Sequence, residues 1–266
     1  MKVKGHMKVK VLAAATVMTI AAFRAAAAAD LPVPPPVYPQ ALPAVAPLAN
    51  WTGCYVGGGL GYGWWRQDSF VQVGGVPATA SITNGGNGWF GQGQVGCDYQ
   101  FTAPLLNMPL VVGAFGDYEG GSIDGTQDFP GVVGAERESA TWSVGGRVGA
   151  LIAPRVLTYF DGGWTQAHFD PVNYNFAIAG GGPSGISLAA QTYNGWFIGG
   201  GFEYALDWLP ISGLFLKTEY RYAQYSAAVV PLSGFPPTTG VVTLNSQKAT
   251  ELISTELVWR FNWLGH

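Results

Sequence analysis

After Asn50 the sequence alternates with a period of two, so that residues of one kind recur at every second position. The alternation is sharp in residues 88–101, where Trp89, Val95, Cys97, Tyr99 and Phe101 alternate with Phe90, Gln92, Gln94, Asp98 and Gln100. In residues 51–65 the even positions are mostly apolar, and glycine occupies most of the odd ones. Successive side chains of a β-strand point to opposite faces. The period therefore predicts strands whose two faces meet different surroundings.

The composition indicates that the apolar faces meet lipid. Only 11% of the residues are charged, whereas 48% are hydrophobic, and a soluble protein normally carries more charge on its surface. Beyond the extreme N-terminus, no apolar run approaches the roughly 20 residues that a membrane-spanning helix needs. In lipid every backbone polar group must be paired within the protein, so a closed β-barrel is the remaining structure that can span. A soluble β-sandwich is the alternative, but its outer faces would be charged.

Eight segments carry the alternation, and the connectors between them are alternately long and short. We expect strands at residues 51–65, 88–101, 110–119, 139–152, 157–167, 191–204, 214–225 and 248–263. The long connectors are 66–87, 120–138, 168–190 and 226–247, and the short ones lie near 102–109, 153–156 and 205–213. Long outer loops and short periplasmic turns are typical of bacterial barrels. The pattern predicts an all-β fold, an eight-stranded antiparallel transmembrane β-barrel.

The tryptophans fall into two groups along these strands. The group near the long connectors has the apolar parity and consists of Trp64, Trp89, Trp142, Trp164 and Trp196. The group at the opposite strand ends consists of Trp51, Trp259 and Trp263. Aromatic residues gather at both interfaces of a membrane. We therefore expect two aromatic girdles.

The N-terminus indicates export. Four lysines precede the apolar stretch 11–23, and three alanines precede Asp30, which is the pattern of a signal peptide over residues 1–29. An N-terminal membrane anchor is the alternative. Residues 30–49 are rich in proline and predict an extended periplasmic leader, and residues 50–266 form the predicted barrel. Without residues 1–29 the chain keeps eight basic and 16 acidic residues, which argues against nucleic acid as a partner.

Three motifs resemble those of a known family. The segments ANWTGCYVGGGLGYGW (49–64), GQGQVGCDYQF (91–101) and TELVWRFNW (255–263) are similar to the eight-stranded outer-membrane proteins of alphaproteobacteria, within the superfamily of OmpA-type and opacity-type barrels. The resemblance implies a Gram-negative outer membrane, with its lipids and lipopolysaccharide as partners. The aromatic residues Trp259, Phe261 and Trp263 resemble the C-terminal signal that the barrel-assembly machinery recognises, although three further residues follow them here.

Motifs for catalysis or cofactors are weak. Residues 91–96 match GxGxxG, but no helical pattern follows, so a dinucleotide site is not expected. His168 lies in sequence near Ser184 and Ser187, and some lipid-A deacylases are small barrels with a Ser–His pair. A glycine-rich segment separates these residues, so we expect a surface histidine. Two cysteines 43 residues apart and His168, the one histidine between residues 7 and 265, do not make a metal site. We predict no enzymatic activity, no cofactor and no metal.

Cys54 and Cys97 share the lipid-facing parity on the first two predicted strands. A hairpin centred on the connector 66–87 places them almost opposite each other. Directly opposed residues of an antiparallel pair lie within disulfide reach, and the periplasm is oxidising. We predict a disulfide between them, with two unpaired lipid-facing cysteines as the alternative.

The inward parity carries most of the charges of the predicted strands. These positions are Asp98, Asp117, Glu119, Arg147, Asp161, Glu203, Lys217, Glu219, Glu256 and Arg260. An isolated buried ion is costly, so such charges must pair or meet water. The register around the short turns sets Arg147 beside Asp161 and Glu203 beside Lys217, and the register around 226–247 sets Glu256 on the other side of Lys217. We expect an ion network that fills the lumen, including Arg260, with a conducting or ligand-binding path as the alternative.

These features favour a non-enzymatic barrel that contributes to envelope integrity and displays its loops at the cell surface. Eight strands enclose an interior about wide enough for side chains to fill, so a large aqueous pore is not expected. A narrow porin that passes small solutes or ions is the second hypothesis. A lipid-A-modifying barrel enzyme is the third.

Overall fold

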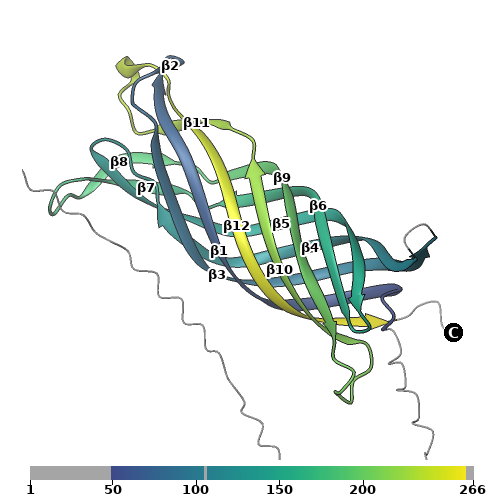
Figure 1. Cartoon of the computed structure of the whole chain (residues 1–266). Helices are drawn as coiled ribbons and strands as arrows, with labels where there is room; N and C mark the ends of the chain where they lie inside the picture. The colour runs from purple at the N-terminus through teal and green to yellow at the C-terminus, as the bar shows by residue number, and fades with distance from the viewer. Residues whose placement is uncertain (1–48, 105–106, 262–266) are drawn as a thin grey trace, which may run out of the picture. The chain divides into compact units, whose positions relative to one another are not determined.

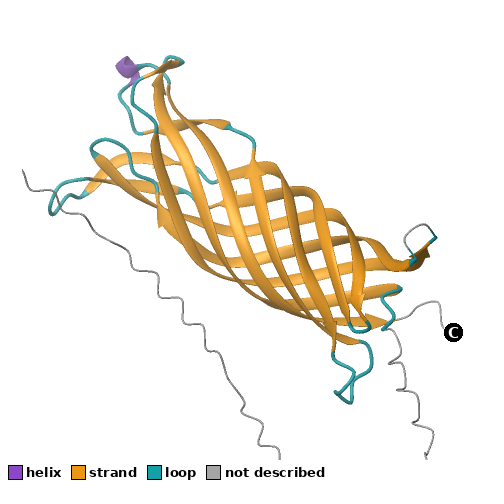
Figure 2. Ribbon diagram, viewed as in Figure 1, coloured by secondary structure: helices purple, strands orange, loops and turns teal. Residues whose placement is uncertain are grey.

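A computed structural model describes residues 49–104 and 107–261, so the signal peptide, the leader up to residue 48 and Trp263 lie outside the described residues. The described chain is almost entirely β-structure (Figure 2). Its elements are β1 (Gly53–Val73), β2 (Val76–Pro77), β3 (Ile82–Ala103), β4 (Met108–Thr126), β5 (Val132–Ala153), β6 (Val156–Phe169), β7 (Val172–Phe176), β8 (Pro183–Leu188), β9 (Gln191–Ala205), β10 (Leu214–Tyr225), β11 (Ala228–Ser233), the 3-10 turn η1 (Pro237–Thr239) and β12 (Val242–Phe261). Within the described ranges, no helix is long and apolar enough to cross a membrane.

Eight long strands form a closed ring. The order is β1-β3-β4-β5-β6-β9-β10-β12, every neighbouring pair is antiparallel, and β12 pairs back with β1 (Figure 1). The closure uses 20 consecutive register pairs, from Cys54 opposite Phe261 to Val73 opposite Val242. A closed ring leaves no long strand edge with unpaired backbone groups. The predicted all-β antiparallel arrangement of eight strands is confirmed.

The ring continues beyond the predicted strand ends as a second ring. In the chain, β7 follows β6, β8 precedes β9 and β11 follows β10. These short strands pair in the order β5-β7-β8-β11-β12. Together with β1, β3 and β4 they close this second level. The residues expected in long loops at 66–87, 120–138, 168–190 and 226–247 are therefore largely strand, and the loop prediction is wrong for them.

The two levels differ in which face of the wall is apolar. In the second ring many inward side chains are apolar and form their own core, which contains Val71, Val132, Val172, Tyr174, Leu188, Val230, Leu232, Val242 and Leu244. Outward positions there include Arg66, Asp68 and Arg137, which are exposed. In the first ring the outward side chains are apolar, such as Leu60 and Phe160. This reversal interrupts the single alternation pattern, so the sequence predicts loops where the second level lies.

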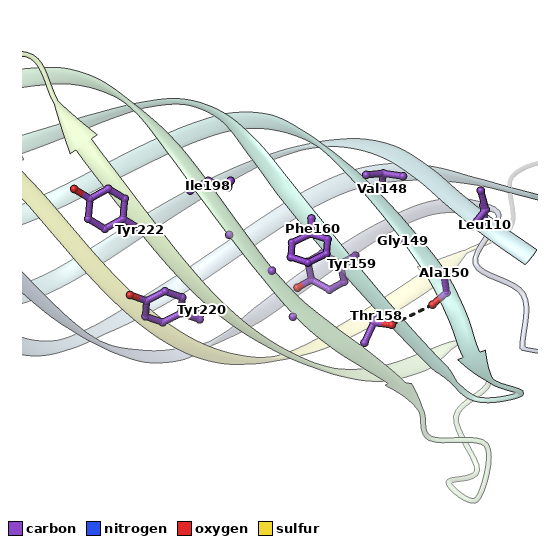
Figure 3. Close-up of a pocket in the computed structure, with 13 residues that line it drawn as sticks. Leu110, Val148, Gly149, Ala150, Thr158, Tyr159, Phe160, Ile198, Tyr220 and Tyr222 are labelled. Carbon is purple, nitrogen blue, oxygen red and sulfur yellow. Dashed lines mark hydrogen bonds between the residues drawn. The ribbon is translucent and has the colours of Figure 1, made fainter.

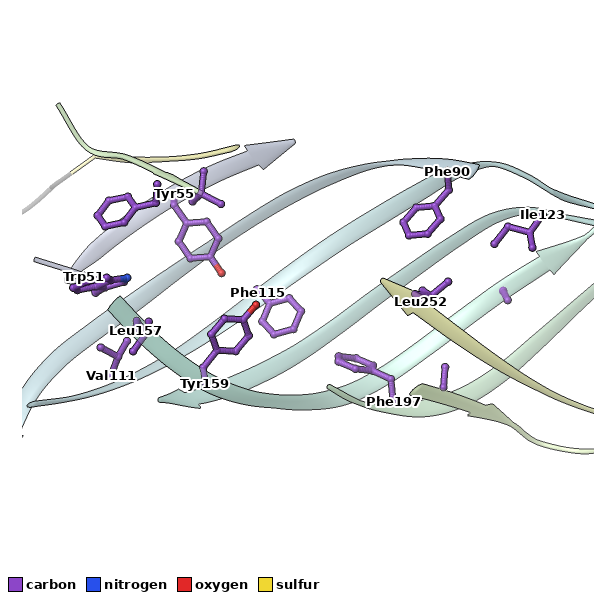
Figure 4. Packing of buried hydrophobic residues seen from close by; sticks show 14 of the residues in the cluster. Trp51, Tyr55, Phe90, Val111, Phe115, Ile123, Leu157, Tyr159, Phe197 and Leu252 are labelled. Atoms are coloured by element: carbon purple, nitrogen blue, oxygen red, sulfur yellow. The ribbon is translucent and has the colours of Figure 1, made fainter. Parts of the chain in front are cut away.

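The first ring also holds aromatic side chains inside its lumen (Figure 4). Tyr55, Phe115, Tyr159 and Phe197 are buried there. The bare inner face of β1 makes room for them: a Cβ on Gly61 would lie 2.2 Å from the ring of Phe90, its register partner. The glycines of β1 thus let large side chains of neighbouring strands fill the interior.

Candidate functional site

The lumen of the ring gathers most of the basic side chains of the described chain. Five of its eight arginines and lysines are at most 7% exposed there, namely Arg147, Lys217, Arg221, Lys248 and Arg260. Nine acidic side chains are equally buried, and they are Asp98, Asp117, Glu119, Glu136, Glu138, Asp161, Glu203, Glu219 and Glu256. All ten positions predicted to face inward are among these fourteen. Twelve of the fourteen form three clusters along the lumen, and Asp161 and Glu138 lie outside these ion pairs.

The first cluster lies at the end of the ring that carries the short turns. Arg147 and Arg260 alternate with Asp98 and Glu203, so that each arginine contacts both carboxylates. The guanidinium nitrogens of Arg147 and Arg260 lie 2.6 and 2.7 Å from the carboxylate oxygens of Glu203. Arg147 also lies over the rings of Tyr55 and Tyr159. Charge-assisted pairs of this kind are the strong hydrogen bonds of proteins.

Trp51 belongs to this cluster, and its predicted place in an aromatic girdle is wrong. Its side chain is fully buried, and Nε1 donates to Glu203 Oε2 over 3.0 Å. Its ring packs on Phe215 with centroids 5.3 Å apart, and its carbonyl accepts from Arg260. The residue precedes β1 but has the same odd parity as the buried Tyr55 and Trp65, so the alternation itself directs it inward. The chain therefore enters the ring with a tryptophan turned into the lumen mouth.

The second cluster lies deeper in the lumen around Lys217 and Arg221. Lys217 Nζ lies 2.8 Å from Glu219 and 3.0 Å from Glu256, and it also donates to Gln94. Arg221 pairs with Glu219 and, on the far wall, with Asp117 and Glu119; the latter contacts are 2.8 and 3.4 Å long. Glu219 thus joins the two bases. The alternation predicted that Glu219, Asp117 and Glu119 face inward. The prediction missed Arg221, although this residue shares the parity of Lys217.

Two of the predicted ion pairs do not form, although their register is as expected. Arg147 is opposite Asp161, and Lys217 is opposite both Glu203 and Glu256. Only the Lys217–Glu256 pair is present; Arg147 contacts Asp98 and Glu203 instead. Asp161 forms no ion pair with a described residue, and both of its carboxylate oxygens are buried without a hydrogen-bond partner. Because long basic side chains reach across the lumen, they can pair with carboxylates on strands that are not their neighbours in the sheet.

The third cluster surrounds Lys248, near the second ring. Lys248 Nζ lies 2.7 Å from Glu136 and also donates to Gln67. Three aromatic rings surround the ammonium group, with Phe169 nearest at 3.9 Å, followed by Trp65 and Tyr193. Cation–π contacts stabilise a desolvated ammonium group. This cluster was missed, although Lys248 has the same parity on β12 as Glu256 and Arg260.

The outward face carries the disulfide and the tryptophans. Cys54 and Cys97 are opposite each other on β1 and β3 and form a disulfide, as predicted. Five tryptophans predicted for one girdle point outward and are partly exposed, namely Trp64, Trp89, Trp142, Trp164 and Trp196. Trp142 packs edge-on against Trp164. Trp259 points outward near the opposite end and is 49% exposed.

The weak catalytic motifs do not assemble. Residues 91–96 lie inside β3, where no helix follows. His168 is exposed, and its Nδ1 lies 3.2 Å from Thr192 Oγ1. Ser184 instead donates to the carbonyl of Tyr174, and Ser187 is opposite Asn173 on β7. Among the described residues, no group of acidic, histidine or cysteine side chains could hold a metal ion.

Comparisons with known proteins give the family. The outer membrane protein OprG from Pseudomonas aeruginosa is 10% identical, with 81% of this chain and 100% of that chain covered and a TM-score of 0.44. Ail, the attachment invasion locus protein of Yersinia pestis, is 13% identical over 78% of this chain and 99% of that chain, with a TM-score of 0.35. Neisserial surface protein A is 13% identical over 76% and 97%, again with a TM-score of 0.35. No curated protein sequence matches the chain. Residues 12–245 match the outer membrane protein beta-barrel domain, and the chain belongs to that family.

Proposed function

We propose that this protein is a non-enzymatic outer-membrane barrel that contributes to envelope integrity and presents its second ring at the cell surface. In this orientation the short turns and the leader face the periplasm. Lipids and lipopolysaccharide surround the wall, and the barrel-assembly machinery inserts it. The observation that carries the proposal is the filled lumen, in which three clusters of paired charges are interleaved with aromatic side chains.

The clusters support a closed lumen because each of their five basic side chains is paired with at least one carboxylate. Removing one partner of a desolvated ion pair leaves a buried charge and costs roughly 3 to 5 kcal/mol. A solute path through the ring would have to separate such pairs at three successive levels. Arg147 and Arg260 span the lumen at one level and Arg221 at another. The lumen is therefore held shut by contacts that are costly to break.

The second ring supports the role in surface display. Its inward side is an apolar core, and its outward side carries exposed charged residues such as Asp68 and Arg137. A wall of this kind is stable in water, whereas the apolar outward face of the first ring needs lipid. The protein thus presents a folded wall outside the membrane, with short connections such as the one at Gly74 and Gly75 at its rim.

Planar-bilayer conductance of the purified, refolded protein tests the closed lumen. We expect no steady conductance from the native chain. A double variant, Arg147→Ala with Arg260→Ala, removes both bases of the first cluster, and we expect it to leak if it folds. The matched control Arg155→Ala removes an arginine whose ion pair with Asp207 is half exposed. Steady conductance by the native chain would contradict the proposal.

A narrow pore for cations is the second candidate. It is favoured by the excess of acidic over basic side chains in the lumen, nine against five. A buried negative surplus attracts small cations and repels anions. Steady cation-selective currents from the native chain would support this candidate. The inferred absence of catalysis is tested separately: His168→Ala should leave the lipid composition of cells that express the protein unchanged.

A further inference from the structure

A hollow of about 680 Å³ lies on the outward face of the ring, where β4, β5, β6, β9 and β10 follow one another (Figure 3). β9 contributes the consecutive glycines 199–201, of which Gly200 has the outward parity. No side chain therefore fills the wall between Ile198 and Phe202. Val148 and Phe160 stand on one side of this gap and Tyr220 on the other.

The lining of the hollow is apolar. No charged residue contributes to it, and Val148, Phe160 and Ile198 expose more than half of their surface. The hydroxyl of Thr158 donates to the carbonyl of Ala150 over 3.3 Å, so it is satisfied within the wall (Figure 3). The hydroxyl of Tyr220 donates to Glu251. The hollow therefore offers contact area and few free hydrogen-bonding groups, which suits a hydrocarbon occupant.

The hollow lies in the half of the wall that is nearer the short turns. At one end Ile198 follows Trp196 by two residues, and the Trp196 ring packs on Tyr222 with centroids 5.9 Å apart. At the other end Thr158 lies two residues into β6, which begins directly after the turn that joins it to β5. An occupant would thus extend from the tryptophan band toward the rim with the short turns.

A single arginine marks that rim. Arg155 lies in the turn between β5 and β6, about 10 Å along the chain from Thr158 at the spacing of a β-strand. Its Nε pairs with Asp207, and the side chain is 44% exposed. Among the described residues, the other basic side chains lie in the lumen or, for Arg66 and Arg137, in the part of the wall that continues into the second ring. Arginine is well suited to phosphate because its guanidinium group presents several donors in one plane.

We propose that this hollow binds one acyl chain of a glycerophospholipid from the periplasmic leaflet, with the lipid phosphate at Arg155. An acyl chain is slender, apolar and free of hydrogen-bonding groups, and it is the material that surrounds this part of the wall. Arg155 lies beyond one end of the apolar hollow, just as the phosphate of such a lipid lies beyond one end of its acyl chain. The inference rests on the proposed orientation, in which the short turns face the periplasm.

Native mass spectrometry of the full mature protein tests the inference after release from outer membranes in mild detergent. The bound lipid is counted per barrel and identified after extraction. We expect about one phospholipid on the native chain at a detergent level that strips the remaining lipid. Heat-modifiable mobility is recorded for each sample, because loss of the folded barrel would contradict the proposed function, whereas a folded barrel without lipid contradicts only this inference.

Ala150→Phe places a ring in the hollow, and Val95→Phe adds the same ring to the outward wall on β3 as the matched control. We expect Ala150→Phe to retain about tenfold less lipid, the factor that corresponds to losing contact with about two methylene groups. Val95→Phe should retain the native amount, and Arg155→Gln should retain less. Val148→Trp fills the same space if Ala150→Phe does not fold.

Three results would overturn the inference. The first is that Ala150→Phe and Val95→Phe retain equal amounts of phospholipid, which would indicate lipid bound nonspecifically around the wall. The second is a bound lipid A molecule instead of a phospholipid. The third is a dimer that replaces the bound lipid on the native chain and is lost in Ala150→Phe, since a second copy would then occupy the hollow.

Discussion

Arg147 and Asp161 face each other directly across β5 and β6, yet Arg147 forms its ion pairs with Asp98 and Glu203. Asp161 stays buried without an ion-pair partner among the described residues. Two carboxylates from other strands outcompete the nearest one because together they satisfy several guanidinium donors at once. The stability of the barrel should therefore respond very differently to changes at these two positions.

Arg147→Met should weaken the barrel strongly. The change leaves Arg260 as the only cationic partner of Asp98 and Glu203, so we expect a loss of roughly 3 to 5 kcal/mol in the free energy of unfolding. Urea unfolding of the refolded protein in lipid vesicles measures it. The control is Arg155→Met, whose half-exposed pair with Asp207 is worth at most about 1 kcal/mol. Equal effects of the two changes would contradict the paired lumen.

Asp161→Asn should leave the barrel at least as stable as the native protein. It removes a buried charge that has no ion pair and keeps nearly the same shape, so no partner is stranded. The same urea measurement applies. A loss as large as that of Arg147→Met would show that Asp161 does pair with Arg147, as the sequence suggested.

Trp51→Phe and Trp259→Phe form a matched pair. Trp51 donates from the buried cluster to Glu203, so its replacement removes a hydrogen bond to a charged group and should cost about 1.5 to 3 kcal/mol. Trp259 points outward and should tolerate phenylalanine within about 0.5 kcal/mol. Unfolding monitored by circular dichroism distinguishes them. If Trp259→Phe were the more damaging change, the lumen position of Trp51 would be doubtful.

The disulfide joins residues 43 apart in the sequence. In the chain-entropy model a loop of this length stabilises the folded state by about 4 kcal/mol. Cys54→Ser with Cys97→Ser should therefore lower the urea midpoint while leaving the ring closed. Thiol labelling of the denatured, unreduced native protein should find no free thiol. Two labelled cysteines would exclude the bond in the mature protein.

The closed ring should make the protein heat-modifiable. A ring that lacks exposed long strand edges resists SDS until it is boiled, because no edge strand is available from which to unravel it. Membrane-extracted protein should therefore migrate differently before and after boiling. Identical mobility in the two samples would contradict the closed ring.

The sequence by itself determined the strands of the first ring and the face on which most of their side chains lie. Parity is a local property of the extended backbone, so it places Cys54 opposite Cys97 and assigns the ten predicted inward charges to the lumen. Arg221 and Lys248 have the same parity as Lys217 and Glu256, so the sequence carries the same inward signal for them.

Only the tertiary structure decided which inward charges meet and how far the wall extends. The pairs Arg147–Asp98 and Arg221–Asp117 connect strands that are not neighbours, and such contacts depend on closure and stagger of the whole ring. Trp51 has the inward parity of β1, but its contacts with Glu203, Phe215 and Arg260 form only because the closed ring brings these residues together at the lumen mouth. The second ring was hidden because the apolar face changes from outward to inward where lipid gives way to water, a boundary that the sequence alone does not mark.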